Sequence, residues 1–574
     1  MKTTIFNIVS IAFLFCGLTA CSDFLDEHVP QGTLSDEQVK NPENAEAMVV
    51  SAYAIFTTAE DINSSFSMWN FDVRSDDAYK GGSGTSDGDV FHQLEVQQGV
   101  LTTNWNINDM WVRLYNSLSR VNSAIYLLNQ SEYNMKEQRL AEMKFLRAYG
   151  HFLLKRLYKN IPFVINENLT YEEYNELSNT TYTNDEGWQL IIDDLMEAYN
   201  TLPEKQAEKG RPTKASAAAF LAKVYLYKAY RQDDAKSNQV SSTNQQDLKK
   251  VIEFTNPALY SNYGLEDDIH NNFRPEEQYE NGRESIWAIQ YSRNDGSTYG
   301  NLNWSYGLIP PNIPGATDGG TDFYKPSQNL VNAYRTGSDG LPLIDTFNNK
   351  DYDMNADNAD PRLFLTVGMP GLPYMFNRKY MMERTSIWSR SNGLYGYYVT
   401  LKQNVDPALI NTYLIKGSYW ASSMNRIVFR YADVLLCRAE AYAQLGQTEQ
   451  AVQLINQIRT RAAGSTQMIS GYPGSYGVKI YITNYRGSYS KDEVIKMVKM
   501  ERRLELGMES ERFFDLVRWG DAATVLNKYY AEEIPHCAIY SDAHFTANKD
   551  EYLPIPFSQI SASNGHYTQN IGNW

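Results

Sequence analysis

The chain is poor in cysteine, with only 4 in 574 residues. Cys16 lies in an N-terminal segment that we expect to be removed, and we assign Cys21 a separate role below. Only Cys437 and Cys537 then remain, and Cys437 lies in an apolar helical segment where it suits core packing. This number excludes a framework of disulfides as the device that stabilises the fold.

Positive charge is also scarce. The chain has 52 Lys and Arg against 68 Asp and Glu, a formal net charge of -16. Nucleic-acid binding needs a basic surface that contacts phosphates, so we expect no nucleic-acid partner. The 7 histidines show no metal-ligand spacing of the His-Glu-x-x-His type, and we expect no metal and no other cofactor.

Long apolar runs are almost missing. One run, 5–18, follows the single positive charge of Lys2 and is too short to span a bilayer permanently, so it is typical of a signal peptide. It ends in Leu18-Thr19-Ala20-Cys21, which matches the bacterial lipobox. We therefore predict that 1–20 is a lipoprotein signal peptide and that Cys21 carries the lipid. The alternative is an ordinary secretory signal with a chance cysteine.

The lipidated Cys21 predicts how the protein meets a membrane. No second run approaches membrane-spanning length, so we expect contact with the membrane only through the lipid. The acidic stretch 22–27 reads either as a solvated tether or as a signal for export to the outer cell surface. We predict a protein that is lipid-anchored in the outer membrane and faces the cell exterior.

Aromatic residues, in contrast, are abundant. The chain has 42 Tyr, 23 Phe and 10 Trp, or 13% aromatic residues. Many of these rings fill a core, but an excess of tyrosine in a secreted, acidic chain also suits carbohydrate binding. Flat C–H faces of sugars pack on aromatic rings, and the phenol can hydrogen-bond sugar hydroxyls.

Apolar residues at helical spacing predict helices on both sides of a different middle region. The predicted helices are 109–130, 136–159, 184–202, 214–230 and 246–254, with later ones from 431, at 491–507 and at 510–529. The middle region, about 260–425, is dense in Gly, Pro, Asn, Asp and Tyr and holds short strand-like pieces such as 284–291. Loops of this kind usually carry function.

The segment 441–451 has the spacing of a tetratricopeptide repeat. Its Tyr and Ala residues suit the packing groove, and Gly446 suits the tight turn between two helices. Segments around Tyr149 and Tyr225 resemble degenerate copies of the same repeat. The sequence therefore predicts a mostly α fold of about four tetratricopeptide-like hairpins, interrupted by the loop-rich insertion.

Several motifs are spread along the chain in a recognisable order. They are Asp109-Met110-Trp111, the run 142–149, Arg211-Pro212-Thr213-Lys214-Ala215, Asp360-Pro361-Arg362-Leu363, the run 430–441, Glu501-Arg502-Arg503-Leu504-Glu505-Leu506, the run 511–520, and Leu553-Pro554-Ile555-Pro556 with Gln569-Asn570. Together the motifs cover nearly the whole chain, which resembles the SusD/RagB family of outer-membrane nutrient-binding lipoproteins.

The resemblance implies a single SusD-like domain over 21–574. Its helical scaffold would comprise about 34–260 and 425–574, and the loop-rich region of about 260–425 would carry a shallow glycan site. Such proteins cover a SusC-like TonB-dependent porin, to which they deliver oligosaccharide or polysaccharide without making or breaking a bond. The charged run at 501–503 is expected to form ion pairs with 511–515 rather than to act as a catalytic centre.

Three aromatic stretches outside helical patterns are the candidate glycan contacts. The first is the Gly-rich segment 69–84, in which we select Asp77 and Tyr79. It lacks the Lys-Ser/Thr of a phosphate-binding loop. The second is 299–306, and the third includes 387–390 and 395–398.

From the second stretch we select Trp304 and Tyr306, because they alternate with small polar residues and the family often places its stacking platform there. From the third we select Trp388 and Tyr395. We expect the site to draw on the first two stretches together. Trp287 lies in an alternating strand and is expected to be part of the core.

Other interpretations of the sequence are a calcium site, a glycoside hydrolase and a protein that binds peptide cargo. The segment 351–357 has alternating oxygen ligands, but Ala356 and Arg362 stand where a calcium loop has Gly and Glu, so we read it as a polar loop with calcium as the alternative. A glycoside hydrolase would need two opposed carboxylates, which no motif marks. Peptide or glycoprotein cargo is the remaining alternative to a glycan.

Overall fold

The computed structural model describes residues 41–57, 72–296, 300–313, 315–317, 319–416 and 420–574. The predicted signal peptide, the lipidation at Cys21 and the acidic stretch therefore lie outside the described residues, as does the segment 58–71, which includes the first residues of the candidate stretch 69–84. The first described helix is α4 (Pro42–Ala54).

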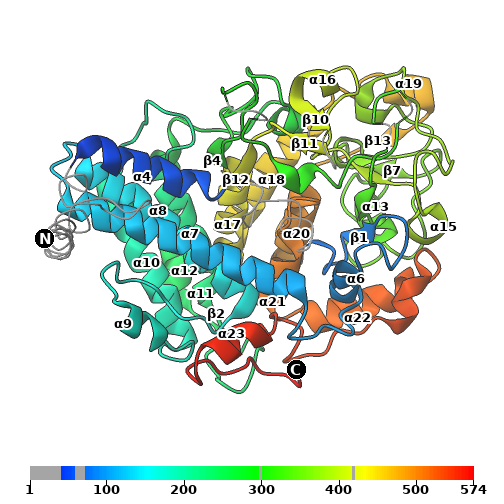
Figure 1. Ribbon diagram of the computed structural model, residues 1–574. Coiled ribbons are helices and arrows are strands. Elements are labelled where there is room, and N and C mark those ends of the chain that lie inside the picture. Colours follow the sequence, from blue (N-terminus) through cyan, green and yellow to red (C-terminus); the bar gives the residue numbers. More distant parts are fainter. Residues whose placement is uncertain (1–40, 58–71, 297–299, 314, 318, 417–419) are drawn as a thin grey trace, which may run out of the picture.

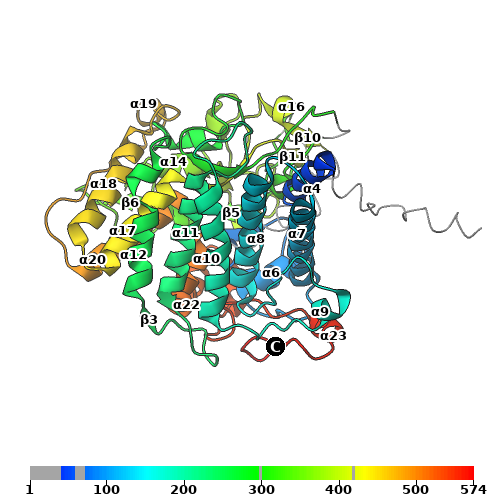
Figure 2. The same cartoon turned by 90° about the vertical axis from the view of Figure 1, so that its left-hand side faces the viewer.

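A row of long helices forms one side of the molecule. It contains α7 (Trp105–Gln130), α8 (Lys136–Tyr158), α10 (Asn184–Thr201), α11 (Lys214–Ala229) and α12 (Gln245–Phe254). Figure 2 shows these five helices standing side by side, each packed on the next. Their apolar faces make the largest core cluster. The predicted helices of this half are confirmed.

The starts of four of these five helices, all but α8, follow from local capping chemistry. α7 begins four residues before its predicted start because the Asn104 side chain accepts hydrogen bonds from the backbone N–H groups of Asn106 and Ile107. Thr183 forms a capping box with Glu186 at the start of α10, and Thr213 caps α11 in the same way. Such caps satisfy backbone donors that the helix itself leaves unpaired.

The second group of helices follows the loop-rich region. It contains α17 (Tyr431–Gln444), α18 (Thr448–Gly464), α20 (Lys491–Leu506), α21 (Arg512–Trp519) and α22 (Ala522–Glu533). α17 packs on α11 and α12, so the two groups form one continuous stack. Gly446 has a φ of 76° in the turn between α17 and α18, a left-handed conformation that glycine adopts without steric cost. The predicted helix-rich fold is confirmed.

The loop-rich region covers one end of this stack (Figure 1) and contributes a second core cluster. Its strands are short: β4 (Ser285–Ile289) pairs with β12 (Arg426–Arg430), β1 (Ala78–Gly81) with β5 (Phe323–Pro326), and β8 (Val367–Gly368) with β9 (Val399–Thr400), each pair antiparallel. Trp287 of β4 is buried and donates its indole N–H to the Gly210 carbonyl at 2.9 Å. The predictions of a strand here and of a core position for Trp287 are confirmed.

The remaining elements are short. The helices are α6 (Asp89–Val96), α9 (Tyr171–Asn175), α13 (Gln328–Ala333), α14 (Arg362–Thr366), α15 (Asn392–Tyr395), α16 (Ile410–Tyr413), α19 (Tyr472–Tyr476) and α23 (Phe557–Ala562), with 3-10 helices such as η3 (Trp304–Tyr306). The strands are β2 (Tyr230–Arg231), β3 (Ser242–Thr243), β6 (Arg335–Thr336), β7 (Asn358–Ala359), β10 (Leu414–Lys416), β11 (Trp420–Ser422) and β13 (Lys479–Ile480). No described helix is long and apolar enough to cross a membrane.

The charged run in α20 ties the loop-rich region to the helices. Glu501 pairs with Arg362 at 2.7 Å, and Arg502 pairs with Asp515 at 2.8 Å as predicted. The third member, Arg503, contacts Asp77 instead of the run at 511–515. All of these side chains are buried, so removing one partner would leave an uncompensated charge in the core. Arg502 therefore pairs as predicted, whereas Glu501 and Arg503 pair with residues outside 511–515.

Candidate functional site

A cavity of about 370 Å³ opens where the loop-rich region meets the end of α22. We call it the Tyr397 cavity. Residues far apart in the sequence line it, including Tyr79, Gln328, Tyr352, Arg384, Tyr397 and Tyr398. Ligand sites are commonly concave, with aromatic walls and a few placed polar groups, and this cavity has both features.

Tyr397 and Tyr398 both line the cavity and are both half-buried. The Arg384 guanidinium lies 5.6 Å from the centre of the Tyr397 ring, within the range of a cation–π contact. The Tyr398 hydroxyl donates to Gln328 Oε1 at 3.0 Å, and Gln328 in turn donates to Asn332 Oδ1 at 2.8 Å. This chain of hydrogen bonds fixes the Tyr398 ring before any ligand arrives.

Burial further favours the neutral form of the Tyr398 phenol. It raises the pKa of Tyr398 to about 12, against the opposing effect of the Arg384 guanidinium. Burial likewise raises the pKa of Tyr352. Neutral phenols can both donate and accept hydrogen bonds, as the recognition of hydroxyl groups requires.

Tyr352 carries the most informative polar atom of the cavity. Its ring is 9% exposed, and its backbone N–H donates to Asn332 Oδ1 at 2.8 Å. Its hydroxyl, however, is buried and finds no hydrogen-bond partner among the described residues. Buried polar groups are nearly always paired, so an orphaned hydroxyl at a cavity wall calls for an explanation.

A histidine and an aspartate face each other at the rim. His536, just after α22, places Nε2 at 3.1 Å from Asp351 Oδ1. Asp351 is the one carboxylate among the described residues that line the cavity. Glycoside hydrolysis uses two opposed carboxylates, and this cavity does not assemble such a pair.

Of the described residues of the first predicted stretch, 72–84, Tyr79 alone lines the cavity. The ring of Tyr79 lines it but is 2% exposed, and its hydroxyl donates to Glu533 while accepting from the Gln328 N–H at 3.0 Å. Asp77 is buried away from the cavity and pairs with Arg503 at 2.7 Å. Both side chains thus have structural partners inside the protein.

The third stretch supplies different residues from those that we selected. Tyr395 is 1% exposed, with its ring centre 6.4 Å from that of Tyr79. Trp388 is buried against Tyr374, with a centroid distance of 5.7 Å. In this conformation neither ring offers an open face to a sugar. The neighbouring Tyr397, which the selection passed over, does line the cavity.

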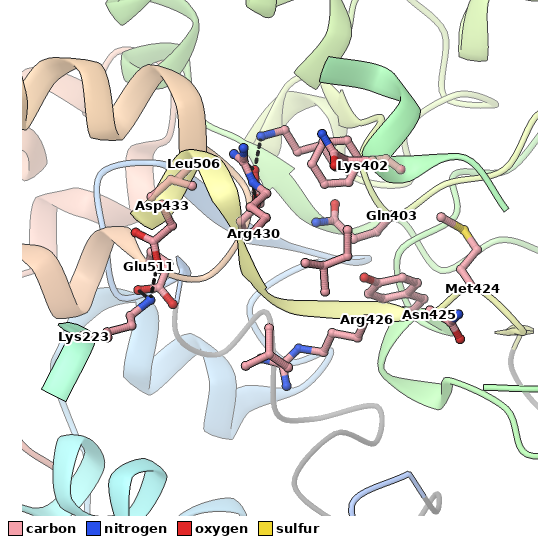
Figure 3. Close-up of a pocket in the computed structure, with 16 residues that line it drawn as sticks. Lys223, Lys402, Gln403, Met424, Asn425, Arg426, Arg430, Asp433, Leu506 and Glu511 are labelled. Atoms are coloured by element: carbon pink, nitrogen blue, oxygen red, sulfur yellow. Dashed lines mark hydrogen bonds and ion pairs between the residues drawn. The ribbon is translucent and has the colours of Figure 1, made fainter. Parts of the chain in front are cut away.

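The second stretch lies elsewhere, in η3, which packs on β11. Trp304 is half-buried, whereas Tyr306 is buried and lines a separate small cavity of about 50 Å³. Figure 3 shows that cavity and the charged groups around it, among them Lys223 beside Glu511 and Asp433. Lys223 pairs with Glu511 at 2.8 Å. The structure thus brings the first and third stretches together at the Tyr397 cavity, and not the first and second.

Sequence reasoning missed Tyr352, Gln328 and Arg384 altogether. Tyr352 stands in the segment 351–357, which we read as a polar loop with calcium as the alternative. In the structure Asp357 pairs with Lys350 at 2.7 Å and with Arg335 at 3.4 Å. The described part of the chain contains no group of three or more His, Cys, Asp or Glu placed to hold a metal ion.

Comparison with known proteins gives matches over most of the chain. Residues 283–574 match a family model described as the SusD family, and residues 23–226 match one described as starch-binding associating with outer membrane. A SusD-like protein P2 from Formosa agariphila is 25% identical, covering 98% of this chain and 99% of its own length. A SusD-like protein from Bacteroides ovatus is 24% identical, covering 90% of this chain and 83% of its own length.

Solved structures share the fold. A SusD-like protein from Bacteroides fragilis superimposes with a TM-score of 0.70 at 19% identity, covering 94% of this chain and 99% of its own. A surface glycan-binding protein A from Bacteroides thetaiotaomicron, in complex with laminarihexaose, superimposes with a TM-score of 0.62 at 20% identity, covering 92% and 99%.

Proposed function

The chain belongs to the SusD/RagB family, and on that premise we propose that it binds a glycan at the cell surface and hands it to a SusC-like TonB-dependent porin. It captures oligosaccharide or polysaccharide and does not cleave it. The lipid on Cys21 holds it at the outer face of the outer membrane, beside the porin.

The observation that carries the proposal is the Tyr397 cavity. Tyr397 and Tyr398 offer rings on which a sugar can stack, and Gln328 and Arg384 stand within reach as hydrogen-bonding groups. The hydroxyl of Tyr352 is buried without a partner among the described residues, and it would gain one if a small shift of the cavity wall exposed it to a ligand that brings its own hydroxyls. Trp304, half-buried outside the cavity, stays a proposed contact for a longer chain.

Two structural relatives suggest where to begin the search for a ligand. One is described as a laminarin-binding SusD-like protein, and another was solved with laminarihexaose. Starch is the second starting point, because the family model that matches residues 23–226 carries that description. These names support a neutral glucan as the first candidate ligand.

The binding test is native affinity electrophoresis through gels that contain laminarin, starch or another neutral polysaccharide. We expect at least one glycan to retard the protein, and Tyr397→Ala to reduce that retardation. Tyr481→Ala is the matched control, because Tyr481 is 43% exposed and is not among the residues lining the cavity. Failure of every glycan to retard the wild-type protein would refute the proposal and favour peptide cargo.

Two further assays address the remaining parts of the proposal. Incubating the protein with the glycan that retards it should release no new reducing ends, whereas sustained release would identify a hydrolase. Affinity purification of the lipidated protein from outer membranes should recover a TonB-dependent porin. Recovery of the protein without any porin would contradict the delivery role.

A further inference from the structure

A second hollow lies away from the Tyr397 cavity, alongside α7. It encloses about 410 Å³, and we call it the α7 groove. One wall is the outward face of α7, and the other is the segment 164–169 together with Tyr174 of α9. In Figure 1, α9 lies at the left of the molecule and α15, next to the Tyr397 cavity, at the right. The two hollows are therefore on different sides of the protein.

The sequence of α7 explains why a groove exists there. Tyr115, Ser119, Ser123 and Tyr126 follow one another at helical spacing along the outward face, so two small serines lie between two large rings. The rise from Tyr115 to Tyr126 is about 16 Å along the axis. Small residues between aromatic ones leave an elongated space instead of a filled surface.

The tyrosines of the groove present rings to solvent. Tyr126 is 42% exposed and Tyr174 is 40% exposed, although large apolar faces are normally buried. Tyr171, one turn before Tyr174 in α9, is 79% exposed. Exposed rings gathered around a hollow mark a binding surface more often than single exposed rings do.

The polar groups of the wall are held in place by the scaffold. Tyr115 donates its hydroxyl to the Pro162 carbonyl at 2.8 Å, and Asn122 donates to the Val164 carbonyl at 3.0 Å. Arg147, paired with Asp194 at 2.6 Å, also donates to the Asn122 side chain at 3.2 Å. A wall fixed in this way loses little conformational freedom when a ligand binds.

The charge of the groove selects the class of ligand. Glu167 is the one charged residue among those described as lining it, and it already accepts from Asn129 at 2.9 Å and lies 3.9 Å from Arg147. No lysine or arginine is among the described residues that line the groove, so an anionic ligand would find no basic partner there. Amides and hydroxyls remain, on Asn166, Asn168 and the serines of α7, and these suit a neutral polyhydroxylated ligand.

We propose that the α7 groove is a second glycan-binding site, which takes a neutral oligosaccharide segment along α7. The rings of Tyr126 and Tyr174 stack on sugar faces, and the serines and asparagines bind sugar hydroxyls. Two sites on one protein hold a polysaccharide more firmly than one site does, because the second contact forms at high effective concentration.

The experiment uses the full mature chain and the polysaccharide that retards it most in the gel panel. Four proteins are compared: wild type, the groove variant Tyr126→Ala/Tyr174→Ala, the cavity variant Tyr397→Ala/Tyr398→Ala, and the combination of both. Tyr481→Ala is again the matched control, since Tyr481 is exposed to a similar extent and is not among the residues that line either hollow. Circular dichroism confirms that each protein is folded.

We expect the groove variant to weaken the apparent affinity by about tenfold, as the loss of stacking anchors does. The cavity variant should keep a residual retardation that the combined variant loses. If the cavity variant is retarded as strongly as wild type while the groove variant is not retarded, the cavity is refuted as a glycan site. The groove is then supported as the site that binds the polysaccharide. A groove variant that is retarded as strongly as Tyr481→Ala would refute the proposal that the groove binds glycan. A panel in which no glycan retards the wild type would refute it too.

Discussion

Replacing Tyr352 by phenylalanine should make the protein more stable and a weaker glycan binder. The substitution removes a single oxygen atom and keeps the ring. That oxygen is buried and has no hydrogen-bond partner among the described residues, so in the ligand-free protein it has lost its hydration without gaining a replacement. Stability and binding should therefore change in opposite directions.

The magnitude follows from the cost of an unpaired buried group. Leaving a buried donor unsatisfied costs about 1–3 kcal/mol, so removing it should raise the free energy of unfolding by about 1 kcal/mol. If the hydroxyl pairs with a sugar, its loss should weaken binding by about 1 kcal/mol, which is a factor of about five.

The assay is urea denaturation followed by fluorescence, with isothermal titration of the glycan identified in the gels. Tyr398→Phe is the matched control, because its hydroxyl donates to Gln328 at 3.0 Å. That variant should lose about 1 kcal/mol of stability, since it leaves the Gln328 acceptor without its partner. The denaturant dependence of both variants should keep the wild-type slope, which indicates an unchanged folded state.

Two results would refute this reasoning. A Tyr352→Phe protein that is less stable than wild type would show that the hydroxyl is satisfied in solution. A Tyr352→Phe protein that is more stable but binds glycan with unchanged affinity would show that the ligand does not contact this atom. The second result would leave the stacking wall of Tyr397 and Tyr398 as the only support for the cavity.

Four further predictions concern binding, core charge, pH and anchoring. Tyr397→Ala should weaken glycan binding by about tenfold in titration calorimetry, with little change in the urea midpoint because the ring is only half-buried; a large loss of stability would show the ring to be part of the core. Glu505→Gln should lower the free energy of unfolding by about 3–5 kcal/mol, because the buried Glu505 pairs with Arg430 at 2.6 Å and with two other arginines; a loss below about 1 kcal/mol would contradict this assignment. Burial lowers the pKa of Lys155 from 10.5 to about 7, so between these pH values the folded chain binds fewer protons than the unfolded chain and its stability should rise with pH. Lys155→Met should show a shallower rise between pH 7 and pH 9 in urea unfolding, and an identical slope would show that Lys155 stays charged in the folded protein. Cys21→Ala should give a protein that is released from the membrane and still binds glycan, because described residues of the two hollows supply the proposed contacts; loss of glycan binding in the released protein would contradict a purely anchoring role.

The helices could be predicted because the information for them is local. Apolar spacing marked α7, α8, α10 and α11, and a capping side chain next to the first residue sets the start of three of them, as Asn104 and Thr213 do. The same holds for β4, whose alternating pattern placed Trp287 in the core. Motifs spread along the chain were enough to indicate the family, since they repeat these local features in a fixed order.

The sequence predicted that the charged residues of α20 form ion pairs, but it did not predict which residue each of them contacts. The charged run of α20 was expected to pair, and one expected contact formed, between Arg502 and Asp515. Arg503 instead contacts Asp77, a residue 426 positions away that had been selected as a ligand contact. A buried carboxylate and an exposed one look alike in sequence, and only packing decides which arginine reaches it.

The cavity was beyond what the sequence alone determines. An aromatic residue in a loop has the same local signature whether it faces the core or the solvent, so Tyr79 and Tyr395 could not be told apart from Tyr397. The walls come from segments that meet only when the loop-rich region folds onto α22. Short-range periodicity thus fixed the helical scaffold, whereas long-range packing decided which rings are buried, which hydroxyl is left unpaired and where a ligand can enter.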